Sequence, residues 1–183
     1  MFSVSLGPSA ELRPLEPWRA AEFAAAVERC REHLRPWIPF ASRVVDEESA
    51  RVLLQDFADR QAADRGAMYG IWVDDVLRGG TLFRGFDAAM GVAEVGVWLD
   101  PSVVGRGLVQ AAVTHMINYA FQVRGLARVE WYCGTENTRS KAAAQRLGMT
   151  YEGTLRSSFA VDGRRLDSEV WAVLASDWPP QPR

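Results

Sequence analysis

The chain has 183 residues, of which 48% are hydrophobic and 24% charged, and this balance predicts one globular domain with a well-buried core. Its formal net charge of −2 lacks the basic excess that nucleic acid requires, so a nucleic-acid partner is not expected. No apolar run reaches membrane-spanning length, so a membrane is not expected as a partner either. The two cysteines and two histidines form no ligand motif, so no metal is expected either.

The first third of the chain predicts one strand and two helices. Residues 10–13 form a short strand that two prolines end. Apolar residues recur at helical spacing over residues 18–34, whereas residues 35–42 hold two prolines and two large aromatic side chains and are predicted as a loop. Asp46 is the predicted N-cap of the second helix.

The middle of the chain changes from strand to helical periodicity. Residues 67–73 and 76–83 predict an antiparallel hairpin around the pair Asp74-Asp75, and residues 92–99 predict a further strand. A helix is predicted from about Gly107 to Arg124. The core stripe of this helix is predicted to comprise Val109, Val113, Met116, Ala120 and Val123.

The last third predicts a strand over residues 127–135 and then a helix that is capped by Asn137 or Thr138. Two strands over residues 150–160 and 167–175 follow. A central strand–helix–strand unit requires at least one parallel strand pair, whereas the hairpins require antiparallel neighbours. The sequence therefore predicts the α/β class, with a mixed sheet and helices on both faces.

No repeat, low-complexity stretch or linker divides the sequence. Residues 1–178 are therefore predicted to form a single domain, and residues 179–183 a frayed C-terminal tail. The N-terminal sequence lacks the basic start and apolar core of a signal peptide, which predicts a cytoplasmic protein with reduced thiols.

Two glycines lie between the strand at residues 92–99 and the helix after it. Gln110 replaces the third glycine of a dinucleotide fingerprint, and no Gly-Lys-Ser/Thr sequence follows. Gly105 and Gly107 remove Cβ atoms where helix N–H groups carry partial positive charge, and Arg106 adds a formal charge. Spacing alone leaves open a phosphate site and a turn with a purely geometric role.

Two longer segments resemble a known family. AEVGVWLDPSVVGRGLVQAAV and RVEWYCGTENTRSKAAAQRLGMTYEG resemble the GNAT superfamily of acyl-CoA-dependent N-acyltransferases, and within it the Rim group, which acetylates the N-termini of ribosomal proteins. The resemblance covers nearly the whole chain. It implies a GNAT-like, mostly antiparallel sheet with a central parallel strand pair splayed in a V, and acetyl-CoA (coenzyme A) as cosubstrate without a metal.

The superfamily's pyrophosphate turn, Gln/Arg-x-x-Gly-x-Gly/Ala, falls on residues 104–109, where Val104 replaces the polar first residue and Val109 the small last one. The resemblance implies that the pantetheine arm enters the V and pairs with the backbone of the strand before the turn. The cofactor-binding residues that it implies are Val97, Trp98, Leu99, Val104, Gly105, Arg106, Gly107, Leu108, Val109, Asn137 and Lys141.

Acetyl transfer to an amine requires a base for the amine and a proton donor for the leaving thiolate. Glu94 is the candidate base, because a carboxylate in a half-buried strand fits a cleft; the alternative is a surface pair with an arginine. Ser140 is the candidate acid, since Rim-like enzymes carry a serine there; the alternative is a hydroxyl that serves the helix start. Tyr132 and Tyr151 are less well placed alternatives to Ser140.

Three aromatic residues are the candidates for contact with the acceptor. Trp37 and Phe40 lie in the Pro-rich loop and are expected to roof the amine pocket, or else to anchor the loop to the core. Tyr69 is expected to line the same cavity. The Rim pattern has a second acidic residue where this chain has Phe159, which weakens a ribosomal-protein substrate.

The sequence thus predicts an N-acetyltransferase that moves an acetyl group directly from acetyl-CoA to a primary amine of a protein N-terminus or a small molecule. Two alternatives remain open at this point. One is a non-catalytic acyl-CoA-binding module, which the two valines of the turn favour; the other is an acyltransferase that uses another acyl-CoA, such as succinyl-CoA. A homodimer is a further expectation, because related folds often pair.

Overall fold

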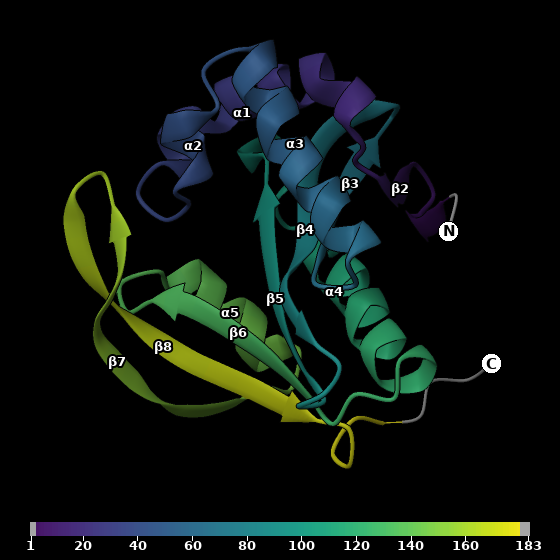
Figure 1. Ribbon diagram of the computed structural model, residues 1–183, viewed down its shortest axis with the longest axis vertical. Helices are drawn as coiled ribbons and strands as arrows, with labels where there is room; N and C mark the ends of the chain where they lie inside the picture. Colours follow the sequence, from purple (N-terminus) through teal and green to yellow (C-terminus); the bar gives the residue numbers. More distant parts are fainter. Residues whose placement is uncertain (1–2, 180–183) are drawn as a thin grey trace.

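The computed structural model describes residues 3–179, and these contain one sheet flanked by helices (Figure 1). The strands of this described range are Val4–Gly7 (β1), Ala10–Pro14 (β2), Ala67–Val73 (β3), Val76–Asp87 (β4), Val92–Leu99 (β5), Arg128–Gly134 (β6), Thr150–Val161 (β7) and Arg164–Leu174 (β8). The α-helices are Ala20–Leu34 (α1), Phe40–Arg43 (α2), Glu47–Ala62 (α3), Leu108–Asn118 (α4) and Thr138–Arg146 (α5).

The strands follow the order β1-β2-β3-β4-β5-β6-β8-β7 across the sheet. Neighbouring strands are antiparallel throughout this order except for β5 and β6, which are parallel. The predicted mixed α/β sheet, with a central parallel pair and helices on both faces, is confirmed.

The parallel pair is short and then opens. β5 and β6 are in register from Val92 and Arg128 to Glu94 and Glu130, and they pair no further. Beyond Glu94, β5 stays paired with β4 as far as Leu99, and β6 stays paired with β8. The two strands therefore diverge in a fork at the centre of the sheet, which is the predicted V.

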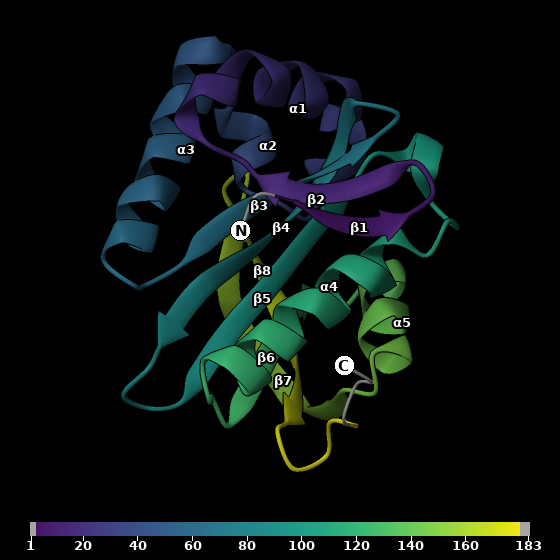
Figure 2. The same ribbon diagram turned by 90° about the vertical axis from the view of Figure 1, so that its right-hand side faces the viewer.

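Helices cover the two faces of the sheet differently (Figure 2). On one face α4 and α5 lie side by side, α4 over β5 and the β1–β3 end and α5 over β6. On the other face α1, α2 and α3 pack over β3, β4 and the end of β5, around Phe23, Trp72 and Trp98. The fork therefore lies between the two helical layers.

Two elements are additional to the prediction. β1 pairs antiparallel with β2, so the N-terminal strand is a hairpin. The segment predicted as a loop over residues 35–42 contains α2, a single helical turn that starts at Phe40. Phe40 is buried against Phe23 and Trp98, with ring centroids 5.6 Å and 6.1 Å away, and this contact fixes a turn that local sequence does not specify.

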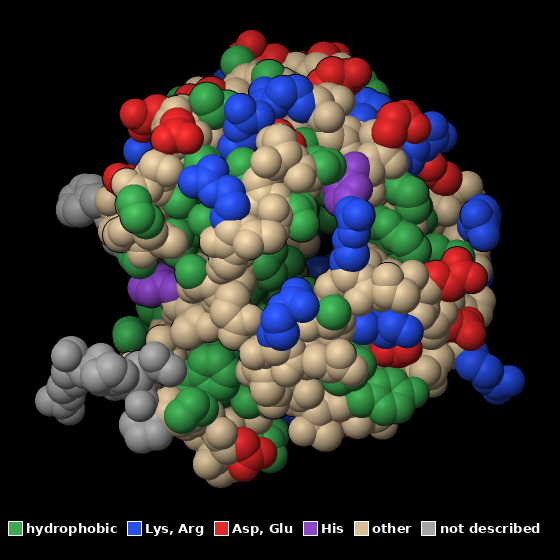
Figure 3. Space-filling model, turned by 180° about the vertical axis from the view of Figure 1, so that it is seen from behind, with side chains coloured by type: hydrophobic (Ala, Val, Ile, Leu, Met, Phe, Trp, Pro, Cys, Tyr) green, Lys and Arg blue, Asp and Glu red, His purple; other side chains and the backbone are tan. Residues whose placement is uncertain are grey.

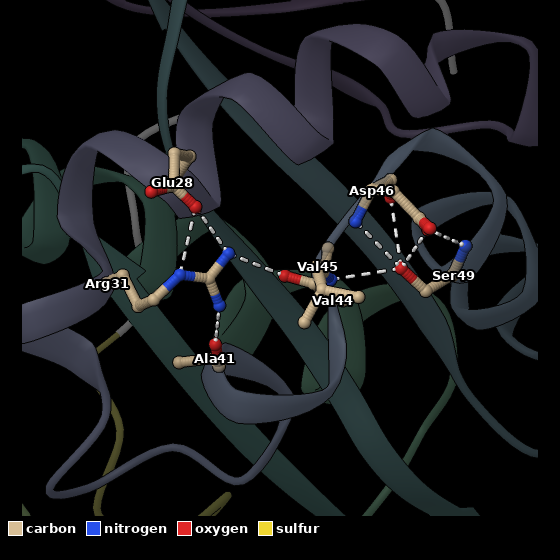
Figure 4. A network of polar contacts seen from close by, with 7 residues as sticks. All are labelled: Glu28, Arg31, Ala41, Val44, Val45, Asp46 and Ser49. Atoms are coloured by element: carbon tan, nitrogen blue, oxygen red, sulfur yellow. Dashed lines mark hydrogen bonds and ion pairs between the residues drawn. The ribbon is translucent and has the colours of Figure 1, made fainter.

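Arg31 of α1 holds α2 in place (Figure 4). Its guanidinium donates hydrogen bonds to the carbonyl oxygens of Ala41 and Val44, the latter at 2.8 Å, and both residues are buried. Two residues further on, the predicted N-cap Asp46 accepts the Ser49 N–H at 2.8 Å and starts α3. Because buried carbonyl groups need partners, Arg31 determines how the chain leaves α1 and enters α3.

The helix predicted to run from Gly107 to Arg124 changes its winding near its end. α4 ends at Asn118, and Tyr119–Val123 form a π-helical turn in which the Arg124 N–H bonds the Tyr119 carbonyl at 3.0 Å. The wider turn rotates the following side chains out of phase with the core stripe. Val123 is therefore 69% exposed, and its predicted core position is wrong.

Two further hairpins match their predicted turns. Asp74 and Asp75 both have positive φ, as do Asp162 and Gly163. These left-handed pairs close β3–β4 and β7–β8. The single domain predicted over residues 1–178 stays a prediction. Of the predicted tail, residues 180–183 lie outside the described residues.

We expect Arg31→Ala to destabilise the fold by about 1–3 kcal/mol, because the Ala41 and Val44 carbonyl groups lose their partner while remaining buried. Urea denaturation measures the loss, and amide exchange over residues 40–44 locates it.

The matched control is Glu28→Gln. Glu28 is 70% exposed and bonds the same guanidinium, so its loss should change stability by less than about 1 kcal/mol. Equal effects of the two variants would contradict the role given to Arg31.

Candidate active site

A cleft of about 1770 Å³ runs through the fork between β5 and β6. Its lining includes Gly105 and Ser140 from the α4–α5 face and Trp37 and Phe57 from the α1–α3 face, with Glu94 between them. Figure 3 shows a hollow on the side of the molecule opposite to that of Figure 1, with basic side chains around it. One continuous space therefore connects the two faces of the sheet.

The glycine turn forms one end of this cleft. Gly105 and Gly107 have φ of +87° and +74°, values that favour glycine, and a Cβ at either would meet no atom within 4 Å. Gly107 is the N-cap of α4, and its carbonyl accepts the first helical bond from Ala111 at 3.0 Å. The N–H groups of the first helical turn therefore face an open surface that suits a diphosphate.

The two valines of the turn are compatible with this site. Val104 is 52% exposed, so its side chain leaves the backbone accessible. Val109 is half-buried and packs against the core under α4. Both line the cleft together with Leu108, and neither occupies the space above the two glycines.

Asp100 fixes the approach to the turn. Its buried carboxylate accepts the Ser102 N–H at 2.9 Å and the Arg78 guanidinium at 3.1 Å. Burial acts to raise the pKa of Asp100, but the hydrogen bonds from Ser102 and Arg78 outweigh it and hold the pKa below its usual value. The strand end is thus tied to the turn by an ionised carboxylate.

The strand before the turn offers free backbone groups. Val97, Trp98 and Leu99 pair on one side with Thr81, Gly80 and Gly79 of β4. The other side of these residues faces the fork, where β6 has already diverged. This unpaired strand edge is of the kind that peptides bind, and it suits a chain with amide groups such as pantetheine.

Helix α5 presents its first turn to the same space. The Asn137 side chain accepts the Ser140 N–H at 3.1 Å, which confirms Asn137 as the N-cap. The Ser140 hydroxyl accepts the Trp131 indole N–H at 2.9 Å, so Trp131 does not use the hydroxyl proton, and the neighbouring Cys133 thiol is one acceptor for it. The donor to this hydroxyl is a side chain, so the alternative in which it serves only a backbone N–H at the helix start does not fit its contacts.

Cys133 lies beside these groups and stays a neutral thiol. It is 7% exposed, and burial raises its pKa to about 11, although a hydrogen bond from Ser140 acts in the opposite direction. A thiol with this pKa is almost fully protonated at neutral pH, which disfavours a covalent cysteine mechanism.

Glu94 is the carboxylate at the fork. Its side chain is 26% exposed and lies 3.3 Å from the Arg84 guanidinium. Burial raises the pKa of Glu94, and Arg84 opposes that rise. The sequence left two interpretations of Glu94 open: a carboxylate in a cleft or the partner of a surface arginine. Glu94 fits both descriptions, since its partner Arg84 is 60% exposed.

Aromatic side chains form the wall on the α1–α3 side. Trp37, Phe40 and Phe159 line the cleft. Gly134 is buried between two of them: a Cβ there would lie 3.4 Å from the Trp37 ring and 3.6 Å from the Phe159 ring. Phe40 also anchors α2 to the core, which is one of the two roles that the sequence left open; its contact with the acceptor stays a prediction.

The segment that carries Trp37 is hydrogen-bonded to the β7–β8 hairpin. The Asp162 carboxylate accepts hydrogen bonds from Arg35 and from the Ser42 hydroxyl, both at 2.6 Å. Figure 1 shows the hairpin rising toward α2 on this side. The loop that carries Trp37 is thereby fixed across the cleft mouth.

Three predicted site residues lie outside the cleft lining. Tyr69 packs on the α4 face of β3, opposite to Trp37, because neighbouring strand residues alternate between faces. Arg106 donates to the Ser9 hydroxyl at 3.1 Å. Lys141 donates to the Thr135 carbonyl at 2.7 Å and pairs with Glu169. The structure therefore does not bring these three side chains to the cleft.

Other cleft residues carry no sequence motif. Gln110 and Arg139 line the cofactor side, and Arg60 lines the opposite side. On β6, residues 128, 130 and 132 are polar and alternate with buried residues, and this period-two pattern places Glu130 and Tyr132 on the face of Glu94. That alternation is the signal by which the Glu130–Tyr132 pair could have been recognised.

Two classes of site find no support in the described residues. Within residues 3–179, no group of three or more His, Cys, Asp or Glu side chains is arranged to hold a metal ion. No helix in the same range is long and apolar enough to cross a membrane.

A forked sheet with an open glycine turn and an N-capped helix beside it suits an acyl-CoA-dependent transferase. The Acetyltransferase (GNAT) domain family matches residues 11–150, and the chain belongs to this family. It is an N-acetyltransferase that moves the acetyl group of acetyl-CoA to an amine. The resemblance stated from the sequence is thereby confirmed.

Individual relatives agree over almost the whole chain. The chain is 28% identical over 179 residues to the putative ribosomal N-acetyltransferase YdaF of Bacillus subtilis, which covers 97% of this chain and 98% of the relative. A crystal structure of a probable acetyltransferase superposes with a TM-score of 0.90 at 27% identity, covering 97% and 99% of the two chains. Mycobacterium smegmatis RimJ in complex with CoA-disulfide gives 0.85 at 26%, covering 93% and 84%.

We expect Gly107→Val to weaken acetyl-CoA binding by more than about tenfold, a loss of about 1.4 kcal/mol or more, because the side chain enters the open surface above the α4 N-terminus. Isothermal titration calorimetry measures the affinity.

Gly125→Val is the matched control, because Gly125 also has a left-handed φ, +66°, and open space but follows the far end of the helix. Both variants should lose about 1–2 kcal/mol of stability. If Gly125→Val weakens binding as much as Gly107→Val, the turn is not the phosphate site.

Proposed function

We propose that the chain acetylates the α-amino group of a protein or peptide N-terminus, with Glu94 as the general base and Ser140 as the general acid. The observation that carries this proposal is the single cleft through the fork, since it brings Glu94 and Ser140 into one space from opposite faces of the sheet. The relative YdaF, named a putative ribosomal N-acetyltransferase, supports an N-terminal acceptor.

The cofactor side is assigned to the residues that fit a CoA group. Gly105, Gly107 and the N–H groups that follow would hold the diphosphate, and the free edge of β5 would hold the pantetheine arm. Acetyl-CoA supplies an activated acetyl carbonyl and a thiolate leaving group. Lys141 and Arg106 are not part of this assignment, because their side chains have other partners.

The acceptor reaches the fork from the α1–α3 side. An ammonium ion near Glu94 is attracted by the carboxylate, and a carboxyl group with a raised pKa is a suitable proton acceptor for it. An α-amino group has a pKa near 7.7–8.0, about 2.5 units below that of lysine, and so loses its proton more readily at neutral pH. This difference favours an N-terminus over a lysine side chain.

Ser140 completes the proton transfers. Its hydroxyl proton is not used by Trp131, which donates its own N–H to the serine oxygen. The hydroxyl can therefore donate to the thiolate that departs on the α5 side of the fork. A homodimer, a cytoplasmic location and the absence of a nucleic-acid partner stay predictions from the sequence.

An acceptor screen tests the proposed substrate class. We expect peptides with free N-termini to release CoA from acetyl-CoA, and the same peptides with an acetylated N-terminus and an internal lysine to release far less. Mass spectrometry of the products locates the acetyl group. Acetyl-CoA binding without CoA release across peptides and small amines would instead establish the non-catalytic alternative.

We expect Glu94→Gln to lower kcat by about 10²- to 10⁴-fold while leaving acetyl-CoA affinity within about twofold, because an amide cannot accept the amine proton. Steady-state CoA release gives kcat, and calorimetry gives the affinity. The matched control is Glu136→Gln, whose exposed side chain borders the same cleft away from the fork. Undiminished kcat in Glu94→Gln at every pH would rule out Glu94 as the base.

A further inference from the structure

A second carboxylate lies next to Glu94 in the fork. Glu94 and Glu130 are directly paired in register, in the last pair before β5 and β6 diverge. Paired residues of parallel strands point to the same face, and neighbouring strands are about 4.8 Å apart. Both side chains are shielded, with 26% and 21% exposed. Two carboxylates this close are a costly arrangement unless the surroundings compensate one of them.

The surroundings compensate Glu130 more fully than Glu94, whose one ion-pair partner is the exposed Arg84. Arg128 donates to one Glu130 oxygen at 2.7 Å and also bonds Glu152 at 2.8 Å, which fixes the guanidinium. The Tyr132 hydroxyl donates to the other Glu130 oxygen at 3.0 Å. Both oxygens of Glu130 therefore accept hydrogen bonds, which fix this carboxylate behind the cleft wall.

The Tyr132 hydroxyl is left as a hydrogen-bond acceptor toward the cleft. Tyr132 lines the cleft, and its proton is directed to Glu130, so the lone pairs of the phenolic oxygen remain available. Burial and the hydrogen bond to Glu130 raise the pKa of Tyr132 to about 12, which keeps the hydroxyl neutral. An N–H group of an incoming amine finds this acceptor on the same strand face as Glu94.

The charged groups around Glu94 come from three elements. Arg84 of β4 is 3.3 Å away and favours its anion. Asp56 and Arg60 of α3 line the same side of the cleft and neutralise each other in an ion pair at 2.8 Å. Glu130 of β6 disfavours the Glu94 anion, in the same direction as burial. Arg84 and Glu130 are thus the two charges that oppose each other at Glu94.

We propose that Tyr132 and Glu130 complete the acceptor site: Tyr132 accepts a hydrogen bond from the acceptor amine beside Glu94, and Glu130 is a positioning residue that orients Tyr132 and keeps Glu94 a better proton acceptor. This inference rests on the proposed function. The ammonium proton passes to a Glu94 oxygen and from there to water in the open cleft, while Tyr132 neither gains nor loses a proton.

Direct titration of Glu94 tests the role of Glu130. In ¹³C-glutamate-labelled protein, the Glu94 carboxyl resonance is assigned from its absence in Glu94→Gln. We expect Glu130→Gln to shift the Glu94 midpoint to lower pH, because the loss of a neighbouring negative charge makes deprotonation easier. Arg84→Gln should shift it to higher pH. An unchanged midpoint in Glu130→Gln overturns the role of Glu130, and the Arg84 variant shows that the method detects a neighbouring charge.

Kinetics with an N-terminal peptide test the role of Tyr132. We expect Tyr132→Phe to raise the acceptor KM about tenfold or more with the acetyl-CoA KM unchanged, because only the amine loses a partner. The matched control is Tyr119→Phe, since Tyr119 packs against Phe83 outside the cleft lining and should behave as wild type. An acceptor KM in Tyr132→Phe equal to that of wild type overturns the assignment.

Failure of this inference differs from failure of the proposed function. If wild-type protein transfers no acetyl group to any N-terminus, the proposed function is wrong, and the Glu94 midpoint still decides whether Glu130 acts on it. If wild-type protein is active and both variants match it in midpoint and acceptor KM, only the Tyr132–Glu130 site is wrong.

Discussion

The divergence of β5 and β6 after Glu94 and Glu130 is the feature on which the rest of the structure depends. Strands that stayed paired would satisfy each other's backbone groups and close the sheet; here the edge of β5 from residue 95 to Leu99 stays open. The helical layers make this possible, because α4 and α5 support one face and α1 to α3 the other. The result is a sheet with a passage through its centre.

The chemical environment differs on the two faces of the sheet, and the two environments meet at the fork. On the α4–α5 side, helix N-termini and open glycines suit a polyanionic group. On the α1–α3 side, aromatic side chains line the same cleft as Glu94 and Tyr132, and Tyr132 is hydrogen-bonded to Glu130. Neither side alone carries out acetyl transfer. In the proposed function, two molecules of different charge reach the fork from opposite faces of the sheet.

The sequence predicts the parts of this arrangement that depend on local patterns. Strand alternation, the Asp46 and Asn137 caps and the glycine turn all follow from residues close together in the chain. The α2 turn does not, because Phe40 takes its conformation from Phe23 and Trp98, which are distant in sequence. The same limit explains two expected ligand contacts, Tyr69 as a cavity aromatic and Lys141 from the family resemblance. The strand face directs Tyr69 elsewhere, and Glu169 holds the Lys141 side chain.

A crystal structure with a bisubstrate analogue, CoA joined through an acetyl linker to a peptide N-terminus, tests the central claim most directly. The account predicts the diphosphate on the turn at Gly105 and Gly107, the linker in the fork, and the peptide nitrogen beside Glu94 and Tyr132. An analogue bound on one face of the sheet, with its linker outside the space between β5 and β6, would contradict it.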